Sequence, residues 1–388
     1  MTKRIFHIGC GLVGSLIAEE LSRDYSVTVM DTSGERLASL KKTVPSIKTI
    51  NAVDGVRQIK EVLSEGYDIV TGAVNGKFAF ETAKAVLESG TSYCDISSHD
   101  PNSDFESLQK TAESNGVFYI PEVGIAPGMT NFVVGRGASL LDEVENVKIY
   151  VGGFPENPKP PFHYQATWSP LDVIEEYDQH VRVVRDGKVK ILRALDGLHE
   201  IDFEPLGKLE AFFTEGLGTL VTTIKAKNMS EMTTRWPGHA AQMRMLRDMG
   251  LFEEKAIKLG GVELIPRKVI ADILMPMWKM EPEKGDRDLL AWRVIVEGKK
   301  GNEMVSYTWE LLDRFDEKTM RTSMSRCTGL TCAIFARAAM EGKVRRVGIA
   351  SPELLACDDD LYEFIMAEQS KRGFKYQEEV KKVMTTSY

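Results

Sequence analysis

The feature that most constrains this fold is a glycine-rich turn near the amino terminus. Gly9, Gly11 and Gly14 form a complete G-x-G-x-x-G, with Leu12 and Val13 inside it, between the apolar run RIFHI and a segment of helical periodicity. In such a turn the first glycine permits the tight bend, the second lets the backbone approach a diphosphate, and the third lets the helix pack on the strand. The helix N-terminus then offers unpaired N–H groups to the anion. The turn therefore predicts a dinucleotide-binding βαβ unit.

An acid at the end of the next predicted strand supports this interpretation. Asp31 follows Gly11 by 20 residues, where a carboxylate can accept hydrogen bonds from the adenosine ribose. Because a carboxylate there repels the 2′-phosphate of NADP, the sequence favours NAD, although Arg36 and Lys41 keep NADP open. Asp54 opens the third predicted helix, where it either contacts the adenine or caps the helix.

The first 140 residues alternate short apolar runs with amphipathic stretches, which is typical of repeated βαβ units. The predicted strands cover 4–8, 26–30, 47–50, 67–73, 91–95 and 117–120, and the predicted helices cover 12–23, 33–42, 54–65, 77–89 and 102–115. Right-handed crossovers make this a doubly wound parallel sheet, a Rossmann fold. Ligands bind at the carboxyl ends of such strands, so we expect Ala73 and Asn75 beside the nicotinamide and Asp95 facing the reaction.

The segment PEVGIAPGMTN at 121–131 interrupts this alternation and predicts a domain boundary. Further along, LLAWRVIVEG and NEMVSYTWELLDRF, joined by KKG, predict an antiparallel hairpin. We therefore expect a dinucleotide-binding domain over 1–125 and a second α+β domain with a mixed or antiparallel sheet over 126–325. The C-terminal segment, about 326–388, should pack back on the first domain.

The amino-acid composition limits the classes of partner and the cellular compartment that we expect. With 49 Lys and Arg against 57 Asp and Glu, the net charge of −8 gives no reason to expect nucleic acid or an anionic membrane. No apolar run approaches the roughly 20 residues needed to span a bilayer, and the glycine turn begins too early to leave room for a signal peptide. The five scattered cysteines contain no C-x-x-C pair and predict neither disulfides nor zinc. We expect a reduced, cytoplasmic protein with no metal.

A set of motifs occurs in order along nearly the whole chain. They are YCDIS (93–97), GIAPGMTN (124–131), VGGFPENPKPP (151–161), WSPLDVIEEY (168–177), LEAFFTEGLGTL (209–220), RWPGHAAQMRMLRDMG (235–250) and GIASPELL (348–355). Together they resemble the saccharopine dehydrogenase/reductase-like family, most closely its lysine 6-dehydrogenase members.

The resemblance implies a homodimer with a cleft between a Rossmann domain and a catalytic α+β domain. It also implies NAD-dependent oxidative deamination of the ε-amine of L-lysine, giving a semialdehyde that cyclises to a piperideine carboxylate. The alternative within the family is a saccharopine reductase or dehydrogenase, which forms or cleaves a secondary amine between an aminoadipate semialdehyde and glutamate. A third interpretation, of another class, is a dinucleotide-binding regulatory protein without turnover.

The chain departs from the lysine dehydrogenase pattern at three places. His163 stands where a glycine is expected before Tyr164, Gly218 where an arginine is expected, and Trp236 where a tyrosine is expected. These positions are expected to line or support the substrate side, so the substrate is less constrained than the fold.

Amine oxidation requires the neutral amine, because an ammonium has no lone pair, and a lysine amine has a pKa near 10.4. Asp95 could hold the ammonium and organise its deprotonation, or it could cap the next helix. His239 is a candidate general base with an ordinary pKa near working pH, or else a structural histidine. We interpret His7, His99 and His180 as structural.

The substrate itself would be a small amino acid. Arg235 could bind its α-carboxylate through the planar guanidinium fork, or could form a salt bridge instead. Tyr164, Trp168 and Ser169 follow the proline-rich turn and could surround the aliphatic stem, although core packing explains both aromatic residues equally well.

Overall fold

The computed structural model describes residues 3–53, 55–97, 99, 102–166 and 170–383. Asp54, Trp168 and Ser169 lie outside the described residues. The chain divides into two compact units, each treated separately below. Unit 1 comprises the residues up to Leu140 together with 218–223 and 325–374, and unit 2 comprises 141–217, 224–324 and the residues from Lys375 onward.

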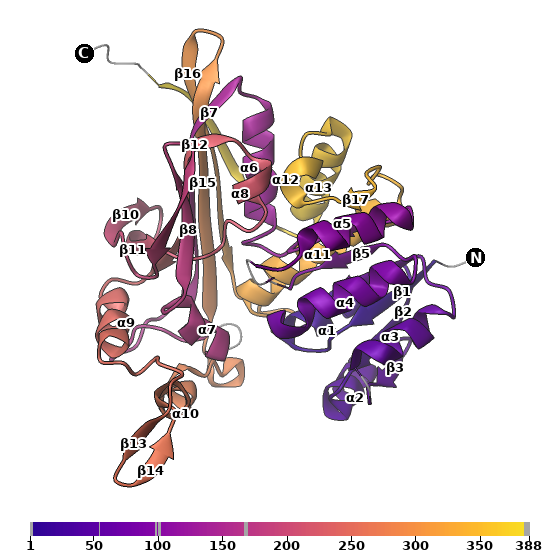
Figure 1. The fold of residues 1–388 in the computed structure, drawn as a ribbon, viewed down its shortest axis with the longest axis horizontal. Coiled ribbons are helices and arrows are strands. Elements are labelled where there is room, and N and C mark those ends of the chain that lie inside the picture. Colours follow the sequence, from indigo (N-terminus) through magenta and orange to yellow (C-terminus); the bar gives the residue numbers. More distant parts are fainter. Residues whose placement is uncertain (1–2, 54, 98, 100–101, 167–169, 384–388) are drawn as a thin grey trace. The chain divides into compact units, whose positions relative to one another are not determined.

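Unit 1 is built on a parallel sheet (Figure 1). Among the described residues, six strands take the order 3-2-1-4-5-6 of a Rossmann fold, and a seventh lies beyond the sixth. Across the sheet they are β3 (Lys48–Asn51), β2 (Ser26–Asp31), β1 (Arg4–Ile8), β4 (Ile69–Gly72), β5 (Tyr93–Asp95), β6 (Phe118–Ile120) and β17 (Gly348–Ile349). The expected doubly wound α/β fold is thereby confirmed, and β17, which the sequence did not predict, extends it.

Helices connect and cover these strands. They are α1 (Leu12–Leu21), α2 (Gly34–Thr43), α3 (Gly55–Leu63), α4 (Gly76–Glu88), α5 (Phe105–Ser114), α6 (Met129–Ser139), α8 (Leu220–Thr223), α11 (Ser323–Met340), α12 (Pro352–Leu355) and α13 (Asp359–Lys371). α3, α4 and α5 lie side by side and bury an apolar cluster with the sheet. Side-chain caps at Ser33, Asn75, Asp104 and Asp358 start four of the helices, as expected for these residue types.

Unit 2 contains a mixed sheet, in which β7 and β12 run parallel and the other pairs run antiparallel. Its main path is β10 (His199–Phe203), β11 (Gly207–Phe213), β12 (Ala226–Arg235), β7 (Glu143–Pro155), β15 (Asp288–Lys300), β16 (Glu303–Arg314) and β18 (Gln377–Val383). β8 (His180–Arg185) pairs with β12 and with β9 (Lys188–Arg193). The predicted β15–β16 hairpin is confirmed.

The remaining elements of unit 2 are α7 (Pro170–Glu176), α9 (His239–Asp248), α10 (Pro266–Trp278), the 3₁₀ turn η1 (Pro282–Lys284) and a small hairpin of β13 (Ile257–Leu259) and β14 (Val262–Leu264). Figure 1 shows this hairpin projecting from the body of unit 2. None of the described helices is long and apolar enough to cross a bilayer.

The unit boundaries differ from the expected 125 and 326 because several segments contact the other unit than the one expected from their position in the sequence. α6 stays in unit 1 because Gly135 lets it touch α12, where an added Cβ would lie 2.1 Å from the Glu353 carbonyl oxygen. α8 joins unit 1, where the Thr223 hydroxyl donates to the Glu353 carboxylate at 2.6 Å. The chain returns to unit 2 at its end because β18 pairs with β16.

A buried ion cluster ties the C-terminal segment to α1. The Glu20 carboxylate, 3% exposed, accepts from Arg372 at 2.6 and 2.9 Å and from Arg337 at 3.3 Å, and it also pairs with Arg23 at 2.8 Å. Arg337 on α11 and Arg372, the residue directly after α13, thereby join the C-terminal segment to α1. Removing one member of such a cluster leaves buried charges without their partner.

Glu20→Gln should therefore lower the free energy of unfolding by about 3 kcal/mol, measured as a shift in thermal or urea unfolding. Glu106→Gln is the matched control, because its pair with Lys110 is exposed on both sides and should be worth less than about 0.5 kcal/mol. Equal small effects of both variants would contradict a structural role for the cluster.

Candidate functional site

Two glycines of the turn are required by the protein's own backbone. Gly9 has φ 101°, and a Cβ there would lie 2.3 Å from the Ala73 carbonyl oxygen. A Cβ at Gly14 would lie 2.3 Å from the Gly9 carbonyl oxygen. Both distances are far inside van der Waals contact, so only glycine lets α1 approach β1 and β4 this closely.

Gly11 has no such internal reason to be glycine. Its φ is −77°, an ordinary value, and nothing lies within 4 Å of an added Cβ. It precedes α1, whose first turn has neither a side-chain cap nor an acidic residue. Open space beside uncapped N–H groups is what a diphosphate requires. The residues present therefore fit the expected dinucleotide, with Leu12 and Val13 in the first turn of the helix.

Asp31 is fixed in place at the end of β2. Its Oδ2 accepts the backbone N–H of Cys10 at 2.5 Å, and its Oδ1 accepts the N–H of Ser33 at 2.7 Å. These bonds join the carboxylate to the glycine turn on one side and to the start of α2 on the other. A half-buried carboxylate held this way can accept from ribose hydroxyls.

Three large apolar side chains are exposed along this edge of the sheet. Leu12, Val53 and Phe78 are 68%, 89% and 60% exposed, and they follow β1, β3 and β4 respectively. Ala73 lies at the same edge, and Asn75 caps α4 by accepting the N–H of Lys77 at 3.1 Å. Sequence reasoning missed Val53 and Phe78, although an apolar residue directly after a strand of this kind could have indicated them.

Asp95 ends β5 and is fully buried. Its Oδ1 accepts the Tyr119 hydroxyl at 3.1 Å, and its carbonyl accepts the Val123 N–H at 2.7 Å. His99 Nε2 lies 2.5 Å from the same Tyr119 oxygen. The structure thus brings together a carboxylate, a phenol and an imidazole from three separate parts of unit 1, and the expected interpretation of His99 as an isolated structural residue misses this grouping.

The pKa of Asp95 is raised from 3.8 to about 7. Burial is the main cause, and the negative charge of Glu122 adds to it. Hydrogen bonds from Tyr119 and Ser97 favour the ionised form and offset part of the rise. A carboxyl group that titrates near neutrality can both accept and return a proton at working pH.

Arg235 lies in unit 2 at the end of β12 and is also buried. Its Nη2 pairs with Glu176 at 2.9 Å, its Nη1 donates to the Thr234 carbonyl at 2.9 Å, and its Nε donates to the Tyr177 hydroxyl at 3.3 Å. Burial opposes its charge, but Tyr177 and Glu176 outweigh that effect and raise its pKa. A substrate carboxylate would have to share this guanidinium with Glu176, a partner that the sequence did not indicate.

His239 differs from the base expected near neutral pH. Its Nδ1 lies 2.9 Å from the Phe162 carbonyl, which can only accept, so Nδ1 carries the proton and Nε2 accepts from Tyr177 at 2.9 Å. Burial and the nearby Arg235 lower its pKa to about 3. Both nitrogens are engaged and the ring is neutral, which is the pattern of a structural histidine.

The other substrate-side positions are packed into unit 2. Tyr164 lies against the Arg235 guanidinium at 4.9 Å and against the Trp278 ring at 5.3 Å. Trp236 donates to the Pro155 carbonyl at 2.8 Å. In unit 1, Gly218 has φ 52°, and an added Cβ would lie 2.4 Å from a Glu122 oxygen. Local geometry therefore favours glycine where the family pattern has arginine.

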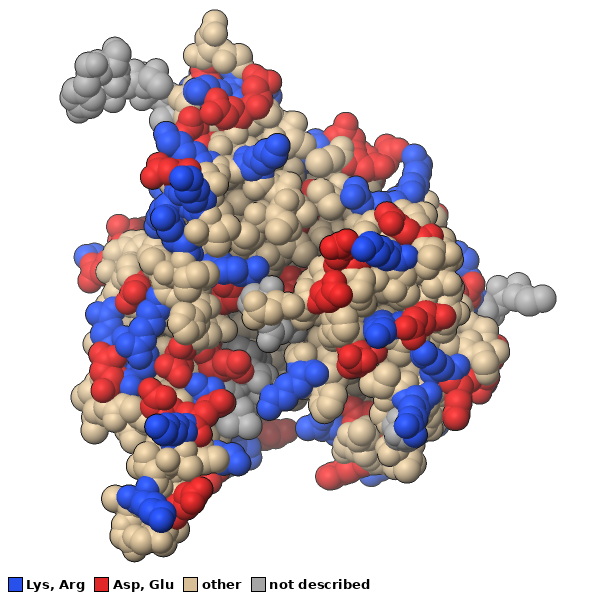
Figure 2. All heavy atoms as spheres, in the orientation of Figure 1, with Lys and Arg blue, Asp and Glu red and all other residues tan. Residues whose placement is uncertain are grey.

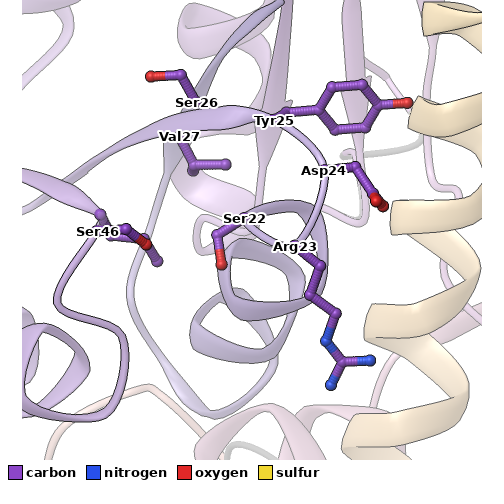
Figure 3. A pocket seen from close by; sticks show the side chains of 8 residues that line it. Ser22, Arg23, Asp24, Tyr25, Ser26, Val27 and Ser46 are labelled. Atoms are coloured by element: carbon purple, nitrogen blue, oxygen red, sulfur yellow. The ribbon is translucent and has the colours of Figure 1, made fainter. Parts of the chain in front are cut away.

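The described surface also contains a hollow in unit 1. Figure 2 shows acidic and basic side chains interspersed over the face in view. This hollow has a volume of about 350 Å³ and is lined by Ser22 to Val27 and by Ser46 and Ile47. Figure 3 shows side chains that line it. It lies at the amino end of β2, the edge opposite the glycine turn, and its charged Arg23 and Asp24 are already paired with Glu20 and Arg337.

Comparison with known proteins gives consistent matches. The profile of the saccharopine dehydrogenase NADP binding domain matches residues 5–120, and that of the saccharopine dehydrogenase C-terminal domain matches 124–374. Mouse mitochondrial alpha-aminoadipic semialdehyde synthase is 24% identical over 271 residues, covering 66% of this chain and 29% of that protein. The chain spans less than a third of the length of the curated relatives it matches.

Solved structures agree in fold. Saccharopine dehydrogenase (L-Glu forming) from Saccharomyces cerevisiae has a TM-score of 0.78 at 17% identity, covering 98% of this chain and all of that one. Homospermidine synthase from Legionella pneumophila, solved in complex with NAD, has a TM-score of 0.60 at 11% identity, covering 99% and 92%.

Asp95→Asn should stabilise the protein, and more so at higher pH. The folded state holds the Asp95 proton up to about pH 7, whereas the unfolded state releases it near 3.8. Stability of the parent therefore falls as pH rises through this window, and at about 1.4 kcal/mol per pKa unit the loss reaches up to about 4 kcal/mol.

The measurement is thermal unfolding of both proteins from pH 4 to pH 8. The advantage of Asp95→Asn should grow over this range, whereas Asp104→Asn, at an exposed helix cap, should follow the parent. An advantage that is constant with pH would show that Asp95 carries no such cost.

Proposed function

The chain belongs to the saccharopine dehydrogenase family, and on that basis we propose that it oxidises the carbon–nitrogen bond of an amino-acid amine, with saccharopine as the leading substrate. The family match places it among oxidoreductases with a nicotinamide-binding Rossmann domain. The observation that carries the proposal within the chain is Asp95, a buried carboxyl whose pKa of about 7 suits proton transfer at neutral pH.

The chemistry assigns a definite task to this residue. When bound, the nicotinamide accepts a hydride from the carbon next to nitrogen. That carbon can release hydride only after the ammonium has lost a proton, because the nitrogen lone pair forms the new C=N bond. Asp95 takes up this N–H proton. Water then adds to the C=N bond and the C–N bond breaks, so that saccharopine yields glutamate and a semialdehyde.

Lysine is the second candidate, and one observation favours it. Saccharopine carries three carboxylates and lysine one, so saccharopine needs more positive charge around it. In the unit 2 cluster the charge of Arg235 is already matched by Glu176 at 2.9 Å. The ordered motifs, GIAPGMTN and RWPGHAAQMRMLRDMG among them, also resemble the lysine 6-dehydrogenase members most closely.

The substrate is tested with purified protein, NAD or NADP, and either saccharopine or L-lysine, following reduced nicotinamide by absorbance. We expect turnover of saccharopine with release of glutamate. In Asp95→Asn, kcat should fall by about 100-fold or more. Turnover of lysine without any glutamate would establish the second candidate. NAD binding with no turnover of either amine would contradict both and support a regulatory protein.

We also propose NAD as the preferred cofactor. The support is the Asp31 carboxylate, whose two backbone hydrogen bonds hold it at the carboxyl end of β2, where it would repel a 2′-phosphate. The family profile, by contrast, is described as NADP binding, so the preference needs its own measurement.

Asp31→Ala should weaken NAD binding by about tenfold or more, which is the loss expected for two hydrogen bonds to a charged acceptor. NADP binding should weaken less or improve, because a repulsive charge has been removed. Titration calorimetry with both dinucleotides measures this, and Glu35→Ala, an exposed acid in the first turn of α2, is the control. A parent protein that prefers NADP would contradict the proposal.

A further inference from the structure

We propose that Tyr119 and His99 are positioning residues that form one hydrogen-bonded chain with Asp95, and that this chain makes Asp95 Oδ2 the oxygen that accepts the substrate proton. The inference rests on the proposed function, in which Asp95 deprotonates an amine. It adds which oxygen reacts and which residues hold it ready.

The hydrogen bonds fix the direction of the chain. The Tyr119 hydroxyl has a single proton and donates it to Asp95 Oδ1 at 3.1 Å. Its oxygen must then act as acceptor toward His99 Nε2, 2.5 Å away, so Nε2 carries the imidazole proton. Burial lowers the pKa of His99 to about 4, so the ring is neutral. The order is therefore His99 to Tyr119 to Asp95, with every proton pointing toward the carboxylate.

Packing holds each member in place. The Tyr119 ring stacks on Tyr93 with centroids 5.3 Å apart and planes 11° from parallel. His99 packs edge-on against Phe105 at 4.9 Å, and its backbone N–H donates to Glu122 Oε1 at 3.2 Å. Because five residues from separate parts of unit 1 converge here, the chain is organised before any substrate arrives.

Gly72 leaves space for the side chains beside Asp95. At Gly72 in β4, an added Cβ would lie 1.9 Å from the Tyr93 hydroxyl oxygen and 3.0 Å from Asp95 Cβ. The Tyr93 hydroxyl thus occupies the space beside the carboxylate that any other residue at position 72 would fill.

The two oxygens of Asp95 are not equivalent. Oδ1 is engaged by Tyr119, whereas Oδ2 is buried and accepts no hydrogen bond within the described part of the chain. A buried carboxylate oxygen without a donor costs free energy, and a substrate ammonium would supply the missing donor. In the transfer, the substrate N–H bond breaks, an O–H bond forms at Oδ2, and the nitrogen recovers its lone pair.

The titratable groups around Asp95 show why its hydrogen bonds are needed to favour the ionised carboxylate. Its titratable neighbours on the elements packed about it are Tyr93, Cys94, His99, Tyr119, Glu122 and Cys332. None of these described neighbours is a cation, since His99 is neutral. The ionised form of Asp95 is therefore favoured by hydrogen bonds from Tyr119, from Ser97 and from the Glu122 backbone, and Tyr119 is the donor joined to the imidazole.

The test is Tyr119→Phe in the NAD-bound protein. Without the hydroxyl, the Asp95 carboxylate loses the donor on Oδ1, and the acid limb of the kcat/KM profile should move up by about one pH unit. The KM for NAD should stay within about twofold, because the glycine turn and Asp31 are untouched. Tyr67→Phe is the matched control, since it removes a hydroxyl bonded to Thr28 at 3.2 Å elsewhere in the same sheet, and it should leave the profile unmoved.

His99 variants separate positioning from packing. His99→Leu should shift the same limb upward by less than Tyr119→Phe does. His99→Gln, which keeps an N–H donor toward Tyr119, should restore most of the parent profile. Equal profiles for the leucine and glutamine variants would overturn the role of His99.

A measurement without turnover keeps the inference distinct from the proposed function. The Asp95 carboxyl can be titrated by ¹³C NMR in the NAD-bound protein, assigned by its disappearance in Asp95→Asn, and its midpoint should rise in Tyr119→Phe. An unchanged titration midpoint would contradict the proposed hydrogen-bonded chain, even if the enzyme is active. Failure to oxidise any amine would contradict the proposed function while this titration still reports on the chain.

Discussion

Everything in unit 1 depends on how closely α1 can approach β1 and β4, and that approach depends on the absence of two Cβ atoms. A Cβ at position 9 would lie 2.3 Å from the Ala73 oxygen, and a Cβ at position 14 would lie 2.3 Å from the Gly9 oxygen. Because both residues are glycine, the helix N-terminus sits directly over the carboxyl ends of the strands. The same edge carries Asp31 and Asp95 at the ends of β2 and β5. One steric condition thus places the N-terminus of α1 at the edge of the sheet where Asp31 and Asp95 also lie, the edge at which we propose that the dinucleotide binds.

Arg235 and Asp95 are both buried, but their surroundings differ. In unit 2, Arg235 has Glu176, Tyr177 and a carbonyl around it, so its charge is compensated and its geometry is fixed. In unit 1, Asp95 accepts hydrogen bonds from Tyr119 and Ser97, but burial still raises its pKa to about 7. Compensated charges stabilise a scaffold, whereas a carboxyl held near its titration point can exchange a proton. On this basis we assign the proposed acid–base role to Asp95, since the pKa of His239 is lowered to about 3.

The sequence predicted what is local and missed what depends on distant neighbours. The glycine turn, the alternation of strands and helices in the first 120 residues and the β15–β16 hairpin follow from spacing and periodicity within short windows, and the structure confirms them. The short β17 pairs with a strand more than 200 residues earlier, which no local pattern can indicate. The same limit applies to His239 and Arg235: their residue types suggested a base and a carboxylate ligand, but their properties are set by Tyr177 and Glu176, which come from another element.

His99 shows the same limit for a residue that the sequence analysis interpreted as structural. Its proposed role depends on neighbours that are close in space and not in sequence. Its partners are Tyr119 on β6 and, through that hydroxyl, Asp95 on β5. Parallel strands bring these carboxyl ends together whatever their separation in the chain, so the useful sequence question is which polar residues end or follow adjacent strands. For β5 and β6, the polar residues that meet this condition are Asp95, Ser97, His99 and Glu122. This rule would have predicted the proposed acid–base site in unit 1 from the sequence alone.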